Sequence, residues 1–570
     1  MNATELLSDR RRFLGYFSSL GLGGTLLPGV LWAQLRAGAE ISTETIECAE
    51  EIAGLTFTDD QRALMLEDLR ENLRSYEAIR AVPLANAAPP AMAFDPLPPG
   101  VAPPVLPDGG VRRAAPTVDR PAGDEELAFL PVSRLSELVR TRQVGSEELT
   151  RLYLDRLGRY DPLLHAAVTV TEERAIRRAR AADAEIARGG YRGPLHGIPW
   201  GAKDLLAVAG YPTTWGTDPF RDQVFDEDAE VVKRLDAAGA VLIAKLTLGE
   251  LAWGDVWFGG QTRNPWSPEQ GSSGSSAGPG AATAAGLVGF SIGSETLGSI
   301  SSPSTRNGVS GLRPTYGRIP RTGAMTLSWS MDKLGPMCRS AEDCALVFDA
   351  IHGPDGRDAA MHTVGFRWEP GGSVRELRVG YVPAVFEGDP TTPQSRLDRE
   401  AFEAVRSLGV QLIPVELPDF PYDPMLIILS AETSAAFDEL TRSGGVDRMV
   451  RQERSAWPNS FRASRTIPAV EYVNANRVRT LAMAAWHELF QRVDVIVTPT
   501  GAPSQLAATN LTGHPALIVP NGFRPDGTPG SITFLAGLFR EDRLLAVGHA
   551  YQEATGFHRR WPPLDRFLQA

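Results

Sequence analysis

Residues 271–315 read GSSGSSAGPGAATAAGLVGFSIGSETLGSISSPSTRNGVSGLRPT, and this stretch decides the fold. It passes from a Gly/Ser run through an Ala-rich segment to an apolar run at 287–292, and then to a second Gly/Ser turn at 298–299. Such small residues let backbone segments approach closely and leave N–H groups free to bind a ligand. The composition is also typical of a flexible linker. Because the run leads into apolar residues and then presents serine again, we favour a core element that carries a site.

The overall composition is that of a large acidic globular protein. The 570 residues, 43% of them hydrophobic, suffice for one large domain with an accessory part or for two to three ordinary domains. The formal net charge of −12 comes without a basic stripe, which argues against nucleic acid as a partner. Cys48, Cys338 and Cys344 form neither a disulfide framework nor a metal-binding spacing. We therefore expect no metal and no cofactor.

The first 39 residues are typical of a targeting segment. Residues 10–14 read RRRFL, which resembles the twin-arginine export motif, and a moderately apolar stretch follows at 16–33. The AGA at 37–39 offers a cleavage site, with LWA at 31–33 as a poorer one. A transmembrane anchor is the alternative, but the apolar stretch is short of the usual ~20 residues and is broken by glycines and a proline. We predict a signal peptide at 1–39 and a periplasmic or secreted protein, with a cytoplasmic location as the alternative.

The remainder divides by composition into three parts. Residues 40–98 form a predicted helical accessory segment, in which Thr58 and Gln61 fit a capping box and the helix continues to about Ser75. Residues 99–127 are rich in Pro, Gly and Ala and predict an extended linker. From 128 to 570, short apolar runs alternate with helical patterns, which predicts an α/β catalytic domain with a central mixed β-sheet covered on both faces by helices. The expected strands are 198–202, 241–245, 287–292, 377–382, 410–415 and 493–498, and the expected helices are 133–142, 146–160, 171–188, 229–238, 341–351 and 396–407.

Two motifs inside the opening stretch resemble the core of the amidase signature family. Residues 293–300 read GSETLGSI, similar to the family's GTDxGGSI turn, and residues 311–318 read GLRPTYGR, similar to GLKPTxGR. Residues 510–516, NLTGHPA, resemble a C-terminal segment of the same family. The resemblance covers about 128–562 and implies the amidase signature fold and hydrolysis of a carboxylic amide. The departures from the family pattern in these motifs are Ser294, Glu295, Leu297 and Arg313.

The resemblance implies a Ser-Ser-Lys catalytic triad in place of Ser-His-Asp. Ser299 matches the nucleophile, and Lys203 matches the lysine of GxPxxxKD, which stands here as GIPWGAKD at 197–204. A lysine serves as a base only where burial lowers its pKa, and Lys203 directly follows an apolar run. The resemblance further implies an oxyanion hole formed by backbone N–H groups. These belong to Thr296, Leu297, Gly298 and Ser299.

The middle serine has two possible registers, because Gly-Ser-Ser occurs at both 271–273 and 274–276. Ser275 lies 24 positions before Ser299 and Ser272 lies 27 positions before it, and the family's spacing matches Ser275. In the family this serine follows a cis peptide bond and relays a proton between the lysine and the nucleophile. Ser276 and Ser294 either orient the triad by hydrogen bonds or are ordinary satisfied loop serines.

Two other interpretations concern neighbouring residues. Residues 274–278 also fit GxSxG, the nucleophile elbow of α/β-hydrolases, but an elbow requires a buried strand directly before it. The preceding residues 261–268 are polar and contain two prolines, which argues against an elbow. Trp253 lies in a stretch that runs beside the active site in relatives, where it lines an acyl pocket or packs in the core.

The sequence thus predicts an exported amidase that takes a small-molecule amide, with esters, anilides and carbamates as further candidate substrates, and forms an acyl-enzyme. We expect a monomer or homodimer that meets the membrane only during export. The alternative is an A-type subunit of a glutamine-dependent aminoacyl-tRNA amidotransferase, which the export motif and the acidic charge disfavour. A non-catalytic binding protein is disfavoured because all three triad positions are filled.

Overall fold

The computed structural model describes residues 41–387 and 391–568, and its contacts divide them into two compact units. One unit contains the described residues up to Ala88 together with Met425–Arg477. The other contains Pro89–Pro424 and the described residues from Val478 onward. The predicted signal peptide at 1–39 lies outside the described residues. No helix in the described part of the chain is both long and apolar enough to cross a membrane.

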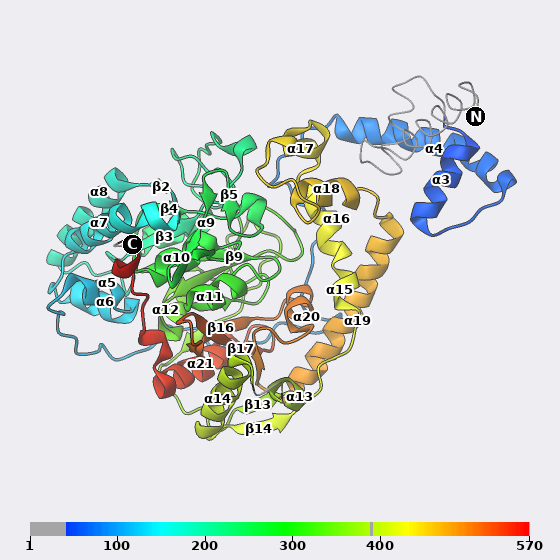
Figure 1. The fold of residues 1–570 in the computed structure, drawn as a ribbon. Coiled ribbons are helices and arrows are strands. Elements are labelled where there is room, and N and C mark those ends of the chain that lie inside the picture. The colour runs from blue at the N-terminus through cyan, green and yellow to red at the C-terminus, as the bar shows by residue number, and fades with distance from the viewer. Residues whose placement is uncertain (1–40, 388–390, 569–570) are drawn as a thin grey trace. The chain divides into compact units, whose positions relative to one another are not determined.

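The larger unit is built on an eleven-stranded mixed sheet, with helices packed against it (Figure 1). In spatial order its strands are β14 (Gln411–Pro414), β13 (Arg378–Tyr381), β15 (Val495–Pro499), β17 (Pro529–Ala536), β16 (Ala516–Phe523), β10 (Ser310–Arg313), β11 (Lys333–Cys338), β9 (Phe290–Glu295), β3 (Pro199–Lys203), β4 (Val241–Leu246) and β2 (Ala167–Val170). Strands β9, β3 and β4 are parallel, as are β15, β13 and β14, and all other pairs are antiparallel. The predicted mixed α/β fold is confirmed.

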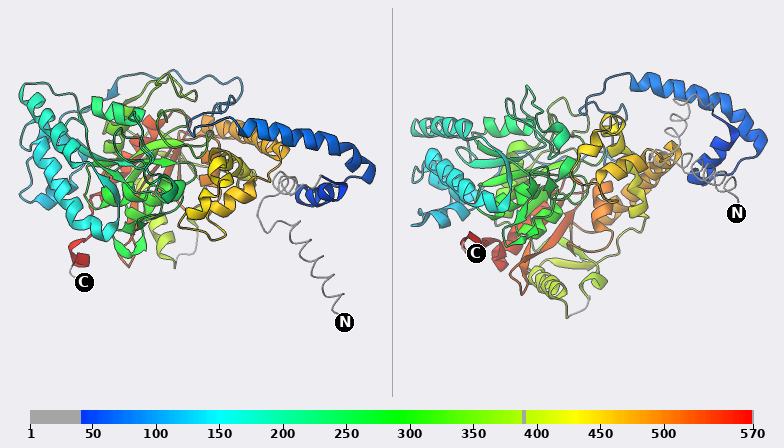
Figure 2. Two further views of the ribbon diagram at one scale, coloured as in Figure 1. Left: turned by 90° about the horizontal axis from the view of Figure 1, so that it is seen from above. Right: turned by 45° about the horizontal axis from the view of Figure 1, so that its top comes forward.

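The following helices belong to the larger unit, and most of them contact strands of the sheet. They are α6 (Val132–Arg140), α7 (Ser146–Leu164), α8 (Glu172–Ala187), α9 (Glu230–Ala237), α10 (Ala277–Ala284), α11 (Ser301–Asn307), α12 (Ala341–Ile351), α14 (Pro393–Ser407), α20 (Gln505–Leu511) and α21 (Glu541–Thr555). Helices α10 and α11 pack on each other, as do α12 and α21, and each pair also contacts central strands. Helix α21, drawn in red near the end of the chain (Figure 2), therefore lies beside β16 and β17 and beside α12, which comes from the middle of the chain.

The strand that leads to Ser299 begins three residues later than expected. The sequence predicted 287–292, whereas β9 spans Phe290–Glu295 and pairs with β11 up to the match of Glu295 with Lys333. Its last three residues, Gly293, Ser294 and Glu295, are fully or nearly fully buried although they are not apolar. The first three residues of the GSETLGSI motif therefore belong to the strand. Pairing with β11, rather than the apolar run in the sequence, sets where the strand ends.

The residues before the second Gly-Ser-Ser do contain a short strand, contrary to expectation. Strand β8 (Ser267–Gly271) pairs with β7 (Arg263–Asn264) in a two-stranded hairpin outside the large sheet. Its residues are half-buried or exposed. It is therefore not the buried core strand that a nucleophile elbow requires.

The smaller unit is helical. Helix α4 (Asp59–Arg80) begins with the predicted capping box, in which Gln61 N–H donates to Thr58 Oγ1 (3.3 Å) and Thr58 N–H donates to Gln61 Oε1 (2.8 Å). It extends five residues beyond Ser75. Its Leu73 packs with two residues beside or within α3 (Thr43–Ala53), namely Ile41 and Ile46. Thus the start of helix α4 follows from local signals in the sequence.

The same unit includes residues that the sequence assigned to the catalytic domain. After β14 the chain leaves the sheet and forms α16 (Ile427–Ala436), α17 (Asp438–Arg442) and α18 (Trp457–Ser464) before it returns at β15. The Nδ2 atom of Asn86 donates to the carbonyl of Ala436 at 3.5 Å. Such contacts between segments distant in sequence group Met425–Arg477 with the N-terminal helices.

Candidate active site

Lys203 is the last residue of β3, a central strand, and its side chain is completely buried. Its Nζ atom donates hydrogen bonds to the Oγ atoms of Ser275 (2.7 Å), Ser294 (2.9 Å) and Ser276 (3.1 Å). Burial lowers the pKa of Lys203 well below its ordinary value, against the opposing influence of Asp332 and Glu295. The site therefore holds an amine that loses its proton far more readily than a surface lysine.

Ser275, rather than Ser272, is the serine that meets this lysine. It lies in the loop before α10, next to a cis peptide bond between Gly274 and Ser275. The hydroxyl of Ser272 instead donates to the carbonyl of Ser273 at 3.1 Å. The structure thus brings together Lys203 and the serine that the spacing to Ser299 selected.

Ser276 and Ser294 link the lysine to the two chain segments around it. Ser276 Oγ donates to the carbonyl of Ser294 (3.1 Å) and accepts from the N–H of Ser294 (3.1 Å). The N–H of Ser276 donates to the carbonyl of Ser299 at 3.1 Å. The two serines therefore join the loop before α10, the end of β9 and the residue that matches the nucleophile.

Ser299 lies in the turn at residues 296–300, between β9 and α11, and only 9% of its surface is exposed. At Gly298 φ is +86°, a left-handed conformation that favours glycine. No described residue accepts a hydrogen bond from the N–H groups of Thr296, Leu297, Gly298 or Ser299. Leu297 replaces a glycine of the family pattern but still supplies its backbone N–H. The turn thus offers a row of unpaired donors, which is what an oxyanion hole requires.

The segment around Trp253 runs beside the Ser275 loop. A Cβ atom on Gly274 would lie 1.8 Å from the carbonyl oxygen of Gly254, so only glycine fits there. The N–H of Ser273 donates to Oδ2 of Asp255 at 2.9 Å. Trp253 itself is half-buried, and its neighbours Gly254 and Asp255 place it next to the Ser275 loop.

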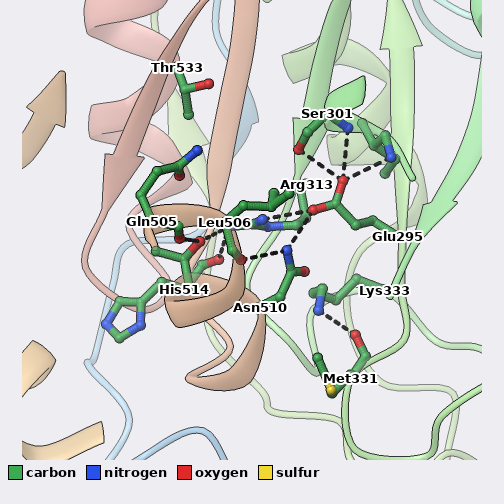
Figure 3. Close-up of polar contacts among 12 residues, drawn as sticks. Glu295, Ser301, Arg313, Met331, Lys333, Gln505, Leu506, Asn510, His514 and Thr533 are labelled. Carbon is green, nitrogen blue, oxygen red and sulfur yellow. Dashed lines mark hydrogen bonds and ion pairs between the residues drawn. The ribbon is translucent and has the colours of Figure 1, made fainter. Parts of the chain in front are cut away.

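A buried polar network behind the turn, shown in Figure 3, was not predicted from the sequence. Glu295 bonds to Ser301, to Arg313 and to Asn510, which lie on α11, β10 and α20. Thr296 Oγ1 donates to Oδ1 of Asp332 at 2.6 Å. The one sequence signal for the network was a charged residue, Glu295, in a run of small and apolar residues.

The chain is similar in sequence to proteins of one family. The Amidase family model matches residues 148–545. The A-type subunit of the glutamyl-tRNA(Gln) amidotransferase of Methylococcus capsulatus is 34% identical over 478 residues, which is 76% of this chain and 98% of that protein. A Mycobacterium tuberculosis protein that bears the amidase name AmiD is 35% identical over 467 residues, 77% of this chain and 97% of its own.

A solved structure supports the same assignment. The native peptide amidase of Stenotrophomonas maltophilia has a TM-score of 0.66 and 29% sequence identity to this chain, covering 76% of this chain and 98% of its own. The family model spans more than half of the 570 residues, and the two relatives match over nearly their whole lengths. The chain therefore belongs to the amidase signature family and is an amide-hydrolysing enzyme.

Proposed function

We propose that this enzyme cleaves carboxylic amides through an acyl-enzyme on Ser299, with Lys203 as the base and Ser275 as the proton relay. The observation that carries the proposal is the 2.7 Å contact between Nζ of Lys203 and Oγ of Ser275 in a fully buried site. A buried lysine with a lowered pKa can accept a proton at moderate pH, which an ordinary lysine cannot.

The reaction proceeds in two stages. As Ser299 Oγ attacks the substrate carbonyl carbon, its proton passes to Ser275 and the proton of Ser275 passes to Lys203. The unpaired N–H groups at 296–299 hold the negative oxygen of the tetrahedral intermediate. The C–N bond then breaks, the leaving nitrogen takes the proton back, and ammonia or an amine departs. Water, activated by the same relay, hydrolyses the ester on Ser299.

Ser276 and Ser294 have a proposed role in orienting the base, and Trp253 has a proposed role in binding the substrate. Ser276 and Ser294 hold the Lys203 amine in line with Ser275, since each bonds to Nζ and both are anchored to backbone. Trp253 contributes to the acyl pocket, which its position beside the Ser275 loop supports. The reaction uses no cofactor or metal, and the substrates are small amides, with esters, anilides and carbamates as further members of the class.

A second candidate function is that of a component of a tRNA-dependent amidotransferase. The observation that favours it is the 34% identity to the A-type subunit of such an enzyme over 98% of that protein. The net charge of −12 and the twin-arginine-like RRRFL favour an exported enzyme that acts alone as a monomer or homodimer. Such an enzyme is periplasmic or secreted and meets the membrane only during export, whereas an amidotransferase component would be cytoplasmic.

The deciding experiment assays the purified chain alone. A panel of primary amides, anilides and esters is incubated with the enzyme, and released ammonia, amine or alcohol is measured. We expect turnover without any second protein. Turnover that appears only after a second protein and charged tRNA are added would establish the amidotransferase function instead.

A further inference from the structure

The turn that carries Ser299 is closed by a single side chain. Glu295 is the last residue of β9, and its Oε2 atom accepts hydrogen bonds from the N–H of Ile300 (2.8 Å), the N–H of Ser301 (2.8 Å) and the Oγ of Ser301 (2.9 Å). The carboxylate therefore reaches across residues 296–299 and joins the end of the strand to the start of α11. One anionic group thus fixes both ends of the proposed oxyanion turn.

The other oxygen of the same carboxylate is held from behind. Its Oε1 atom accepts from Nη1 of Arg313 (2.8 Å), on β10, and from Nδ2 of Asn510 (2.9 Å), on α20. Arg313 is held in turn by Thr509 Oγ1 (2.7 Å) and the carbonyl of His514 (3.0 Å). Figure 3 shows the side chains of Arg313 and Asn510 pointing toward Glu295. The contacts tie the turn to the GLRPT and NLTG motifs, to which the catalytic steps assign no role.

Burial and charge make this arrangement rigid. Glu295, Arg313 and Asn510 are all fully buried. Burial by itself raises the pKa of Glu295, but the Arg313 guanidinium and the hydrogen bonds from Ser301 and Asn510 together outweigh it, and the pKa is lowered to about 2. The group is therefore a carboxylate at any working pH, and its five donors leave neither oxygen unsatisfied. A buried charge in such a network resists displacement, because moving it would leave donors and acceptors without partners.

The turn depends on this outside support. The shape of the turn is not fixed by hydrogen bonds from its own N–H groups. No described residue accepts a hydrogen bond from the N–H groups at 296–299. Helix α20, which carries Asn510, also contacts the turn, because a Cβ atom on Gly298 would lie 3.2 Å from Leu506 Cδ2. Catalytic donors must hold their positions to within roughly 0.5 Å.

We propose that Glu295, Arg313 and Asn510 are positioning residues that set the location of Ser299 Oγ and of the oxyanion N–H groups. The proposal rests on the proposed function of Ser299 as nucleophile. These residues do not touch the substrate, so their loss should lower the rate of acylation while substrate affinity stays nearly constant. A purely structural role would lower stability and leave the rate of the folded enzyme unchanged.

The test compares Asn510→Ala with Asn521→Ala in the full-length enzyme. Asn521, which lies on β16 and not at the turn, is a matched control. Its buried amide also donates to a carboxylate, that of Asp398 on α14, at 2.9 Å. The measurements are kcat, KM, the thermal midpoint Tm, and the rate at which a fluorophosphonate probe labels Ser299, followed by peptide mass spectrometry. All rates are taken well below each variant's Tm.

We expect Asn510→Ala to lower kcat and the labelling rate by about tenfold or more, the size of a lost hydrogen bond to a charged group, with KM within about twofold. Asn521→Ala should lower Tm by a similar amount but change neither rate by more than about twofold. Equal rates in the two variants would overturn the proposal. Unlabelled Ser299 in the wild-type enzyme would instead overturn the proposed function on which it rests.

A milder variant covers the case in which Asn510→Ala does not fold. Ser301→Ala removes one hydroxyl contact with Glu295 at the turn side and creates little empty space. We expect it to slow labelling of Ser299 by about threefold or more with KM unchanged. Labelling at the wild-type rate in Ser301→Ala would contradict the proposal.

Discussion

The Nζ atom of Lys203 lies 2.7 Å from Oγ of Ser275, and both groups are buried. The two residues are 72 positions apart in the chain and meet where the end of β3 lies beside the loop before α10. The lysine has no hydrogen bond to a carboxylate among the described residues, and its contacts there are with three serine hydroxyls. This pairing of a desolvated amine with a hydroxyl is the physical basis of the proposed base.

The first prediction concerns the register of the duplicated Gly-Ser-Ser. Ser275→Ala should lower kcat by about 10²- to 10⁴-fold, the usual contribution of a proton-transfer group. Ser272→Ala should lower it by less than about threefold, because it removes only a neutral hydrogen bond to the carbonyl of Ser273. Steady-state kinetics on an activated anilide decide the matter. Comparable losses, or the reverse order, would show that Ser275 is not the relay.

The second prediction concerns the pH dependence of acylation. Because burial lowers the pKa of Lys203, the neutral amine is present at moderate pH and is lost as the pH falls through that pKa. Single-turnover acylation should therefore slow as the pH is lowered. Lys203→Ala and Lys203→Arg should both lose most activity, since the guanidinium of arginine does not deprotonate at accessible pH. Near-normal acylation in Lys203→Ala would exclude this base.

Histidine variants are the control for that prediction. All eight histidines lie in the described residues, and none of them hydrogen-bonds to Ser275 or Ser299. For the buried His514, desolvation lowers the pKa to about 3, so its ring is neutral at working pH. We expect each histidine to be replaceable with activity retained in variants that fold. A collapse of acylation in one well-folded histidine variant would indicate a histidine-based mechanism, in which that loss is roughly 10⁴-fold.

The third prediction concerns stability. The unfolded chain binds a proton at Lys203 with the ordinary pKa of 10.5, and the folded chain binds it more weakly. The free energy of unfolding of the wild-type enzyme therefore rises as the pH rises toward 10.5. It falls as the pH falls toward the lowered pKa of Lys203. Lys203→Met removes this dependence. Urea unfolding of both proteins between about pH 6 and pH 10 should show that the stability advantage of the variant shrinks as pH rises. A constant difference would mean that the folded-state pKa is not lowered.

The sequence predicted the parts of this site that are local. The resemblance to the family, through its spacing to Ser299, pointed to Ser275, and the apolar run before Lys203 pointed to a buried strand end. Strands β10, β11, β16 and β17 were not predicted, because they carry Gly, Pro or Asn that break the apolar pattern. These segments form strands because they pair with strands that are distant in the sequence. The hydrophobic pattern of the sequence does not show that pairing.

The network behind the turn could not be predicted for the same reason. Glu295 meets Arg313 across 18 positions but meets Asn510 across 215. Only the order of strands in the sheet brings α20 to the turn. Read locally, Glu295 is a charged residue in a Gly/Ser turn, which is usually solvated. The fold instead buries it completely and supplies five donors.

The fourth prediction concerns export, on the evidence of RRRFL at 10–14 and AGA at 37–39. Protein recovered from outside the cytoplasm of the native cell should begin after residue 33 or after residue 39. Replacing Arg10 and Arg11 with lysine should retain the protein inside. N-terminal sequencing of fractionated cells is the measurement. Intact chain beginning at Met1 and confined to the cytoplasm would rule out export and favour the amidotransferase candidate.

The most direct measurement is peptide mass spectrometry of the enzyme quenched during single turnover of an activated anilide. We predict one acyl group on Ser299 in the wild-type enzyme. The adduct should be absent in Ser299→Ala and should form about 10²-fold or more slower in Lys203→Ala and Ser275→Ala. An adduct on a different residue, or hydrolysis of the anilide by Ser299→Ala at the wild-type rate, would contradict the Ser-Ser-Lys mechanism.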